Sequence, residues 1–295
     1  MSSRTTIERN AVGRHLGAMT LVLGALLFLP GGCDGESIRR NSKLSRSYYL
    51  LGRDYLAKKQ AGLAVSELIK AIKYDPDNAE AHRLLGVIFF LEGVKAANFI
   101  DRDHCIKGAA ARDQLMEANK NFRQARDHLT KVVNLGKKKK KIESEALNYL
   151  ANIAIHFKRY DVAITVAGTA LENILYRNRF LSLGTRGQAY FKKGDLDKAA
   201  RDLRQSLFHQ PRFCVGRYWL AKVYYARKRY ELAEEELKKV ISNSKCPLQD
   251  AYQLLGLCYL KQRKSEEARD VFQKCVARNP KSCLSEECRR YARLI

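Results

Sequence analysis

The stretch YYLLGRDYLAKKQAGLAVSELIKAIKYDP, residues 48–76, decides the fold. Within it the small residue Gly52 follows a large aliphatic residue, and the aromatic Tyr55 comes three places later. Ala64 lies twelve residues after Gly52, and the apolar Leu68 lies four residues further on. This spacing suits two antiparallel helices that cross closely at their small residues, and the closing proline ends the second helix because it cannot continue the hydrogen-bond ladder. The stretch therefore predicts a helical hairpin.

The same pattern recurs along the chain at intervals of 34 to 36 residues, apart from one longer interval. Five of its six copies carry an aromatic residue three places after the small one. A fixed period of this length is typical of stacked hairpins, in which each unit packs only on its neighbours. The six small residues are Gly52, Gly86, Ala151, Gly187, Ala221 and Gly256.

This pattern resembles the tetratricopeptide repeat and covers about 240 of the 295 residues. The resemblance implies an all-α fold, a right-handed superhelical solenoid of about six helix-turn-helix repeats over residues 45–282. Residues 283–295 (CLSEECRRYARLI) are predicted to form an amphipathic capping helix that covers the edge of the last repeat. An insertion at about 94–121 splits the second repeat, and we expect it to lengthen the helices or to add a lid.

The N-terminal segment 1–32 is predicted to be a lipoprotein-type signal peptide. Three arginines precede an uncharged run, 16–29, which is shorter than a comfortable membrane span. The small residues before Cys33 resemble the lipobox of bacterial lipoproteins, which implies acylation of Cys33 and a flexible tether over residues 33–44. The alternative is a plain signal peptide or an uncleaved anchor with an incidental cysteine. Asp34 keeps the inner membrane open as a location, because aspartate at this place retains lipoproteins there in some bacteria.

The net charge of +24 is extreme. Nucleic acid, anionic membrane surfaces and acidic proteins all attract such a chain, and export argues against nucleic acid. Five consecutive lysines at 137–141 are either a solvated loop or an electrostatic contact with phosphate head groups or an acidic partner.

The first helix of each repeat in such a stack lines a concave groove. Asn148 and Asn152, one helical turn apart, can bond the carbonyl and the amide of an extended peptide, and aromatic residues beside them can supply apolar anchors. The mixture suits a peptide with apolar and acidic character, although each residue could instead simply cover a neighbouring helix. By analogy with the family, the predicted groove residues are Tyr49, Arg53, Leu56, Arg83, Val87, Phe90, Asn148, Asn152, Ile155, Gln188, Phe191, Tyr218, Lys222, Tyr225, Gln253, Leu257 and Leu260.

Seven cysteines remain besides Cys33, which is an odd number. A periplasmic location permits disulfides, and Cys214–Cys246 or Cys275–Cys288 are possible pairs, but spacing alone does not decide. Cys258 and Cys275 could equally be small core residues. The seven are Cys105, Cys214, Cys246, Cys258, Cys275, Cys283 and Cys288.

Motifs for chemistry are missing from the sequence. The six histidines are scattered, with no His-Glu-x-x-His motif, and neither a Cys-x-x-Cys pair nor a glycine-rich phosphate loop occurs. We therefore predict a protein-binding function without catalysis, cofactor or metal site.

A lipobox, about six repeats and a capping helix together resemble the pilotin lipoproteins of type IV pili (the PilF, PilW and Tgl group), with the Tgl-like branch nearest. The resemblance implies a location at the periplasmic face of the outer membrane and a secretin subunit as protein partner, whose assembly the lipoprotein promotes. The alternative is a general envelope scaffold that serves outer-membrane protein insertion or peptidoglycan enzymes.

Overall fold

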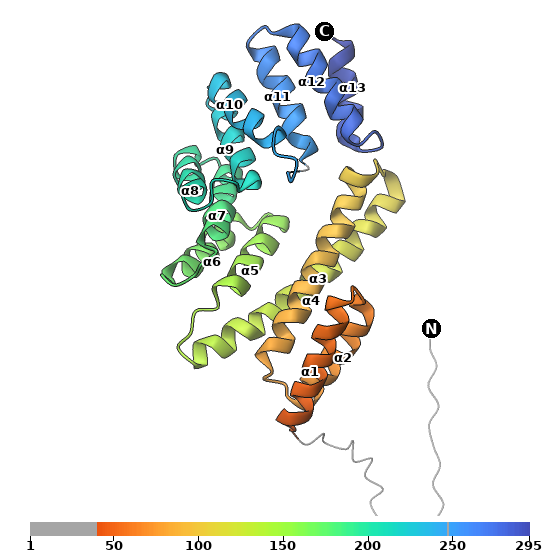
Figure 1. Cartoon of the computed structure of the whole chain (residues 1–295), viewed down its shortest axis with the longest axis vertical. Helices are drawn as coiled ribbons and strands as arrows, with labels where there is room; N and C mark the ends of the chain where they lie inside the picture. Colours follow the sequence, from red (N-terminus) through yellow and green to blue (C-terminus); the bar gives the residue numbers. More distant parts are fainter. Residues whose placement is uncertain (1–39, 247) are drawn as a thin grey trace, which may run out of the picture. The chain divides into compact units, whose positions relative to one another are not determined.

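The computed structural model describes residues 40–246 and 248–295, and the regular structure in these residues is helical throughout (Figure 1). They belong to one compact unit, in which each predicted repeat is a helical hairpin. The fold is thus the all-α repeat solenoid that the sequence predicts. The hairpins are α1 (Ser42–Ala57) with α2 (Ala61–Tyr74), α3 (Ala79–Asn98) with α4 (Gly108–Lys138), α5 (Ser144–His156) with α6 (Tyr160–Glu172), α7 (Arg179–Lys193) with α8 (Leu196–His209), α9 (Cys214–Ala226) with α10 (Tyr230–Ile241), and α11 (Gln249–Lys261) with α12 (Ser265–Arg278).

The small residues that define the repeat lie where the two helices of a hairpin cross. A Cβ atom added at Gly52 would lie 2.8 Å from Cγ of Leu68, and one added at Gly187 would lie 2.7 Å from Cγ of Leu203. Both leucines are completely buried. The backbone of the first helix therefore contacts the core side chain of the second helix directly, which is why the repeat requires a small residue there.

The insertion in the second repeat lengthens its two helices. Helix α3 continues to Asn98 and passes into a π-helical turn, η1 (Phe99–Asp103), before α4 begins at Gly108. Helix α4 spans 31 residues, so this hairpin extends well beyond the others (Figure 1). We call its tip, residues 99–107, the strap.

The strap is fixed to the C-terminal end of the array. A disulfide joins Cys105 to Cys283 at the start of the capping helix α13 (Cys283–Arg293). The backbone N–H of Cys105 donates to the carbonyl oxygen of Lys281 at 2.9 Å, and the ammonium of Lys107 pairs with Glu286 at 3.1 Å. The insertion therefore connects the second repeat to the cap across 178 residues of sequence.

Two more disulfides hold the last two repeats. Cys214–Cys246 links the start of α9 to the loop before α11, and Cys275–Cys288 links α12 to α13. Both pairings that we considered from the sequence are therefore confirmed, and Cys275 is not a free core thiol. Cys258 is the remaining thiol of the described residues, and burial raises its pKa to about 12.

The N-terminal boundary of the array differs slightly from the prediction. Helix α1 begins at Ser42, three residues before the predicted start at 45, because the side chain of Asn41 accepts a hydrogen bond from the N–H of Leu44 and caps the helix. The predicted signal peptide, Cys33 and most of the predicted tether lie outside the described residues.

A pair of histidines joins the two helices of the second hairpin. Nδ1 of His82 lies 2.9 Å from Nδ1 of His128, and Nε2 of His82 lies 3.1 Å from the carbonyl oxygen of Pro76. Burial lowers the pKa of both imidazoles, and His82 also contributes to lowering that of His128, which falls to about 4. The charge of Lys131 lowers the pKa of His82 further, while nearby aspartates oppose these effects.

Acid is expected to destabilise this hairpin. In the unfolded chain the histidines have a pKa near 6.5, so the unfolded state binds protons more readily than the folded state. Their contribution to stability is therefore fully present above about pH 6.5 and is lost as the pH falls towards 4. Allowing for solvent screening, we expect the free energy of unfolding to fall by about 1 to 2 kcal/mol between pH 7.5 and 5.

Urea unfolding at the two pH values measures this loss. His128→Gln should reduce the pH dependence, with His156, whose pKa burial also lowers, contributing to what remains. His209→Gln, at an exposed position, should leave the pH dependence intact. Equal pH dependence in the two variants would show that the histidine pair is not responsible.

Candidate functional site

The inner face of the array is formed by the first helix of each hairpin. Successive first helices, from α1 to α11, contact one another, whereas among the described residues successive second helices do not. A stack that is closer on one side curves towards that side, so the first helices line a concave surface. We call this surface the groove.

Aromatic and basic side chains from α7 and α9 meet on the groove. Nζ of Lys222 lies 4.8 Å from the ring centroid of Trp219, and 5.6 Å from those of Phe191 and Tyr218. Lys192 approaches the same indole at 5.6 Å, and the rings of Phe191 and Trp219 are 5.5 Å apart. We call these five residues the aromatic–lysine cluster. Three of them were predicted groove residues.

The cluster contains a partly buried positive charge, the ammonium of Lys222. Burial lowers the pKa of the Lys222 ammonium, the charge of Lys192 lowers it further, and Asp250 opposes the shift. None of the ion pairs formed by the described residues includes Lys222. An ammonium among aromatic rings, partly shielded from water, attracts a carboxylate more strongly than an exposed lysine does.

The strap reaches the groove beside this cluster. Its Arg102 pairs with Asp250, at the start of α11, at 3.4 Å, and Asn279 donates a hydrogen bond to the carbonyl oxygen of Arg102. Burial raises the pKa of Tyr218, and the charge of Asp250 raises it further, whereas Arg102 lowers it. A pocket of about 940 Å³, lined by both Arg102 and Asp250, lies where the strap meets the last repeat.

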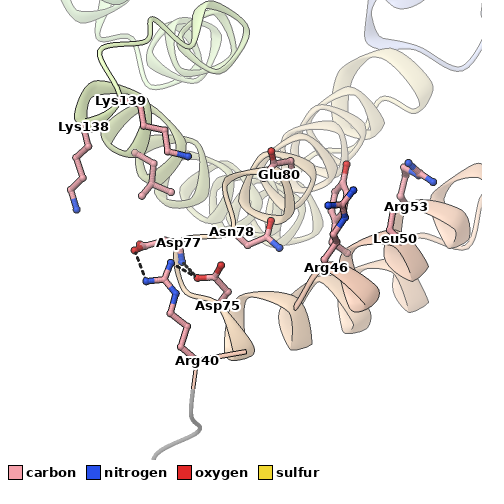
Figure 2. A pocket seen from close by; sticks show the side chains of 12 residues that line it. Arg40, Arg46, Leu50, Arg53, Asp75, Asp77, Asn78, Glu80, Lys138 and Lys139 are labelled. Atoms are coloured by element: carbon pink, nitrogen blue, oxygen red, sulfur yellow. Dashed lines mark hydrogen bonds and ion pairs between the residues drawn. The ribbon is translucent and has the colours of Figure 1, made fainter. Parts of the chain in front are cut away.

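At the other end of the groove, α1 and the end of α4 enclose a pocket of about 660 Å³ (Figure 2). Two predicted groove residues, Tyr49 and Arg53, line it together with Arg46. Lys138 and Lys139, from the predicted lysine run, complete its basic lining. We call it the N-terminal pocket.

The predicted asparagine pair forms hydrogen bonds within the fold. Asn148 is only 7% exposed, and its side-chain oxygen accepts hydrogen bonds from Ser182 at 3.3 Å and Thr185 at 3.1 Å. The side-chain amide of Asn152 donates to the carbonyl oxygen of Asn148 and to Thr185. These bonds join α5 to α7. The side-chain amide of Asn148 and the side-chain oxygen of Asn152 have no hydrogen-bond partner among the described residues, so peptide binding by the pair stays a prediction.

Several other predicted groove residues also make contacts within the fold. Arg83 pairs with Glu143 at 2.7 Å, and the ring of Phe90 packs on Tyr149 with centroids 4.9 Å apart. Gln253 donates a hydrogen bond to Glu287 of the capping helix. The remaining ones are partly exposed: Leu56, Val87, Ile155, Gln188, Tyr225, Leu257 and Leu260.

Sequence reasoning missed two residues of this site. Trp219 lies two places before the small residue of its repeat, outside the positions carried over from the family, yet it is the single tryptophan of the chain. Arg102 lies in the insertion, and the repeat pattern does not predict that the insertion packs against the C-terminal end of the array. The presence of a cysteine in the insertion was the one available signal that this segment is held in place.

Residues 40–246 and 248–295 contain no group of three or more histidine, cysteine, aspartate or glutamate side chains arranged to hold a metal ion. None of the described helices has both the length and the apolar character needed to cross a membrane.

Three family models match parts of the sequence. Those described as TPR repeat and as tetratricopeptide repeat match residues 52–93 and 182–207. A third, described as anaphase-promoting complex, cyclosome, subunit 3, matches residues 206–275. No curated protein matches the sequence of the chain.

The fold is similar to those of several solved structures. PilW, described as a widely conserved type IV pilus biogenesis factor, gives a TM-score of 0.62 at 18% identity over 84% of this chain and 99% of that chain. PilF of Pseudomonas aeruginosa gives 0.58 at 17% identity over 84% and 97%. The Cut9–Hcn1 hetero-tetramer of the APC/C gives 0.65 at 16% identity, over 86% of this chain and 44% of that chain. At such low identity the similarity shows the fold alone, an all-α solenoid of tetratricopeptide repeats.

Proposed function

We propose that this tetratricopeptide-repeat chain binds an extended, acidic segment of a protein partner in its groove, with the aromatic–lysine cluster as the main anchoring point. The observation that carries the proposal is Lys222, a partly buried ammonium that has aromatic neighbours and no ion pair among the described residues. A carboxylate of the partner would supply the opposite charge. Trp219 and Phe191 would supply apolar contact area beside it.

We further propose that the partner is a secretin subunit and that binding promotes assembly of the secretin ring in type IV pilus biogenesis. The similarity in fold to PilW and PilF, over nearly the whole length of each, supports this assignment. The basic charge of the chain favours an acidic segment of that subunit.

The proposed location is the periplasmic face of the outer membrane, with the protein held there by lipid on Cys33. The support is the sequence before that cysteine: basic residues, an uncharged run and two glycines. A lipid-tethered scaffold meets its partner at the bilayer surface, where its effective concentration is high. Fractionation of inner and outer membranes tests the location. The measurement is needed because Asp34, next to Cys33, is a residue that retains lipoproteins in the inner membrane of some bacteria.

Deletion of the gene is expected to abolish the heat-resistant secretin multimers seen on a gel. Wild-type protein should restore them, and a variant with both Trp219→Ala and Lys222→Glu should not, because it loses the proposed anchor and reverses its charge. We expect the double variant to bind the secretin subunit at least about thirtyfold more weakly. Circular dichroism and the thermal midpoint establish that it is folded.

Lys245→Glu is the control, since this lysine is exposed and belongs to the loop between α10 and α11, outside the five residues of the cluster. It should restore the multimers. Normal multimers in the deletion strain would refute the secretin role, and mass spectrometry of proteins that co-purify with the chain would then identify an outer-membrane assembly or peptidoglycan partner. Equal affinity of the double variant and the wild type would refute the anchoring role of the cluster.

A further inference from the structure

The N-terminal pocket carries basic side chains from two separate parts of the chain. Figure 2 shows Arg46 and Arg53 rising from α1 on one side and Lys138 and Lys139 at the end of α4 on the other. The last two belong to the run 137–141, in which all five lysines are exposed. The solenoid therefore places part of the lysine run opposite the arginines of the first helix.

The acidic residues of this pocket are largely neutralised within the fold. Arg40 pairs with Asp75 at 2.9 Å and with Asp77 at 3.6 Å, and Lys131 pairs with Asp77 at 2.8 Å. The hydrogen bond from Lys131 holds the pKa of Asp77 below its usual value. Glu80 also lines the pocket.

The cations opposite these pairs are free to meet an external anion. No ion pair of the described residues includes Arg46, Lys138 or Lys139, and Arg53 has only a 3.5 Å contact with the exposed Asp54 beside it. The pocket therefore has an excess of positive charge, and its volume of about 660 Å³ is open to solvent.

The position of the pocket in the chain connects it with the proposed anchor. Arg40, which lines the pocket, is also the first described residue, and Cys33 lies seven residues before it. Seven residues span at most about 25 Å when fully extended. A lipid on Cys33 would therefore hold this pocket close to the membrane surface, where the potential of anionic head groups acts within about a Debye length, roughly 8 to 10 Å.

We propose that the N-terminal pocket binds the phosphate groups of anionic lipids, so that the end of the array next to the tether rests against the membrane surface. The proposal rests on the lipid anchor of the proposed function. It leaves the aromatic–lysine cluster, at the other end of the groove, for the protein partner.

The test uses unlipidated protein, so that head-group binding is measured without the anchor. Residues 34–295 suffice, because residues 38–295 form one compact unit. We expect this protein to sediment with vesicles of phosphatidylcholine and phosphatidylglycerol, but not with vesicles of phosphatidylcholine alone, and to be released by high salt. The triple variant Arg46→Glu, Lys138→Glu, Lys139→Glu should bind anionic vesicles at least about tenfold more weakly, since each basic residue near such a surface contributes about 1 kcal/mol.

A charge-matched triple variant is the control. Arg212→Glu, Lys245→Glu and Lys261→Glu change three exposed residues elsewhere by the same amount of charge, and this protein should keep most of its binding. Equal binding of the two triple variants would overturn the proposal, and so would equal binding of the wild type to both kinds of vesicle.

Failure of the anchor can be told apart from failure of the pocket. Mass spectrometry of the native protein reports whether Cys33 is acylated, independently of the vesicle result. If the pocket variant binds vesicles normally but fails to restore secretin multimers, the pocket serves the protein partner and the lipid proposal is wrong.

Discussion

Alanine in place of both Cys105 and Cys283 is expected to lower the free energy of unfolding by up to about 5 kcal/mol. The bridge closes a loop over 178 residues of sequence, and a loop of this size removes much of the conformational freedom of the unfolded chain. It also joins the second hairpin to the cap. In an open solenoid each repeat is stabilised only by its neighbours, so this connection should make distant repeats unfold together.

Equilibrium unfolding in guanidinium chloride measures both effects. Trp219, the single tryptophan, reports on the fourth and fifth hairpins, and far-ultraviolet circular dichroism reports on all helices. The two signals should change together in the oxidised wild type and separate in the variant. Removing Cys275 and Cys288 is the comparison. These cysteines are 13 residues apart and join only α12 to α13, so we expect their removal to lower the free energy of unfolding by about 3 kcal/mol. Unchanged midpoints in the Cys105–Cys283 variant would mean that the strap adds no stability.

Leucine at position 187 is expected to destabilise the protein by about 3 kcal/mol or more. A Cβ atom at Gly187 would already lie 2.7 Å from Cγ of Leu203, which is completely buried, and leucine adds three further carbons. The helices α7 and α8 must then separate, or Leu203 must leave its position. Because the groove is built from the first helices, their displacement should also weaken partner binding at Phe191, on the same helix.

The control for this substitution is Gly62→Leu. A Cβ atom there meets nothing within 4 Å, and the residue lies exposed in α2. This variant should therefore be as stable as the wild type or slightly more so, because leucine favours the helix over glycine. Similar thermal midpoints for the two variants would refute the close crossing of α7 and α8.

The fold could be predicted because its determinant is local and repeated. In four of the six repeats the small residue and a large side chain sixteen places later lie in one hairpin, as Gly52 with Leu68 and Gly256 with Phe272, so the spacing gives the crossing. The turn between the two helices of a hairpin was harder to predict from the sequence. Lys59, Lys228 and Arg263 occupy it with φ near +60°, a conformation that favours glycine, and these residues carry no signature of a turn.

The site was only partly predictable from the sequence. The repeat register gives a residue's position on the groove, but it does not show which hydrogen bonds or ion pairs the side chain already makes within the fold. The repeat register placed Lys222 and Tyr218 on the first helix of a hairpin, and both lie in α9. The side-chain oxygen of Asn148 accepts hydrogen bonds from α7, and these bonds depend on which residues the next repeat offers. The strap depends on a contact between Cys105 and Cys283, which no periodic pattern connects.

The strap has a mechanical consequence. Helices α4 to α12 all lie between the two bridged cysteines. If one end of the chain is held at a membrane and the other end is pulled, the tension passes from Cys105 directly to Cys283 through the covalent bond. The enclosed repeats then bear no load and cannot be drawn out, and only the segments outside the bridge lengthen. The groove formed by α5 to α11 would therefore keep its shape under a force that unravels the first hairpin.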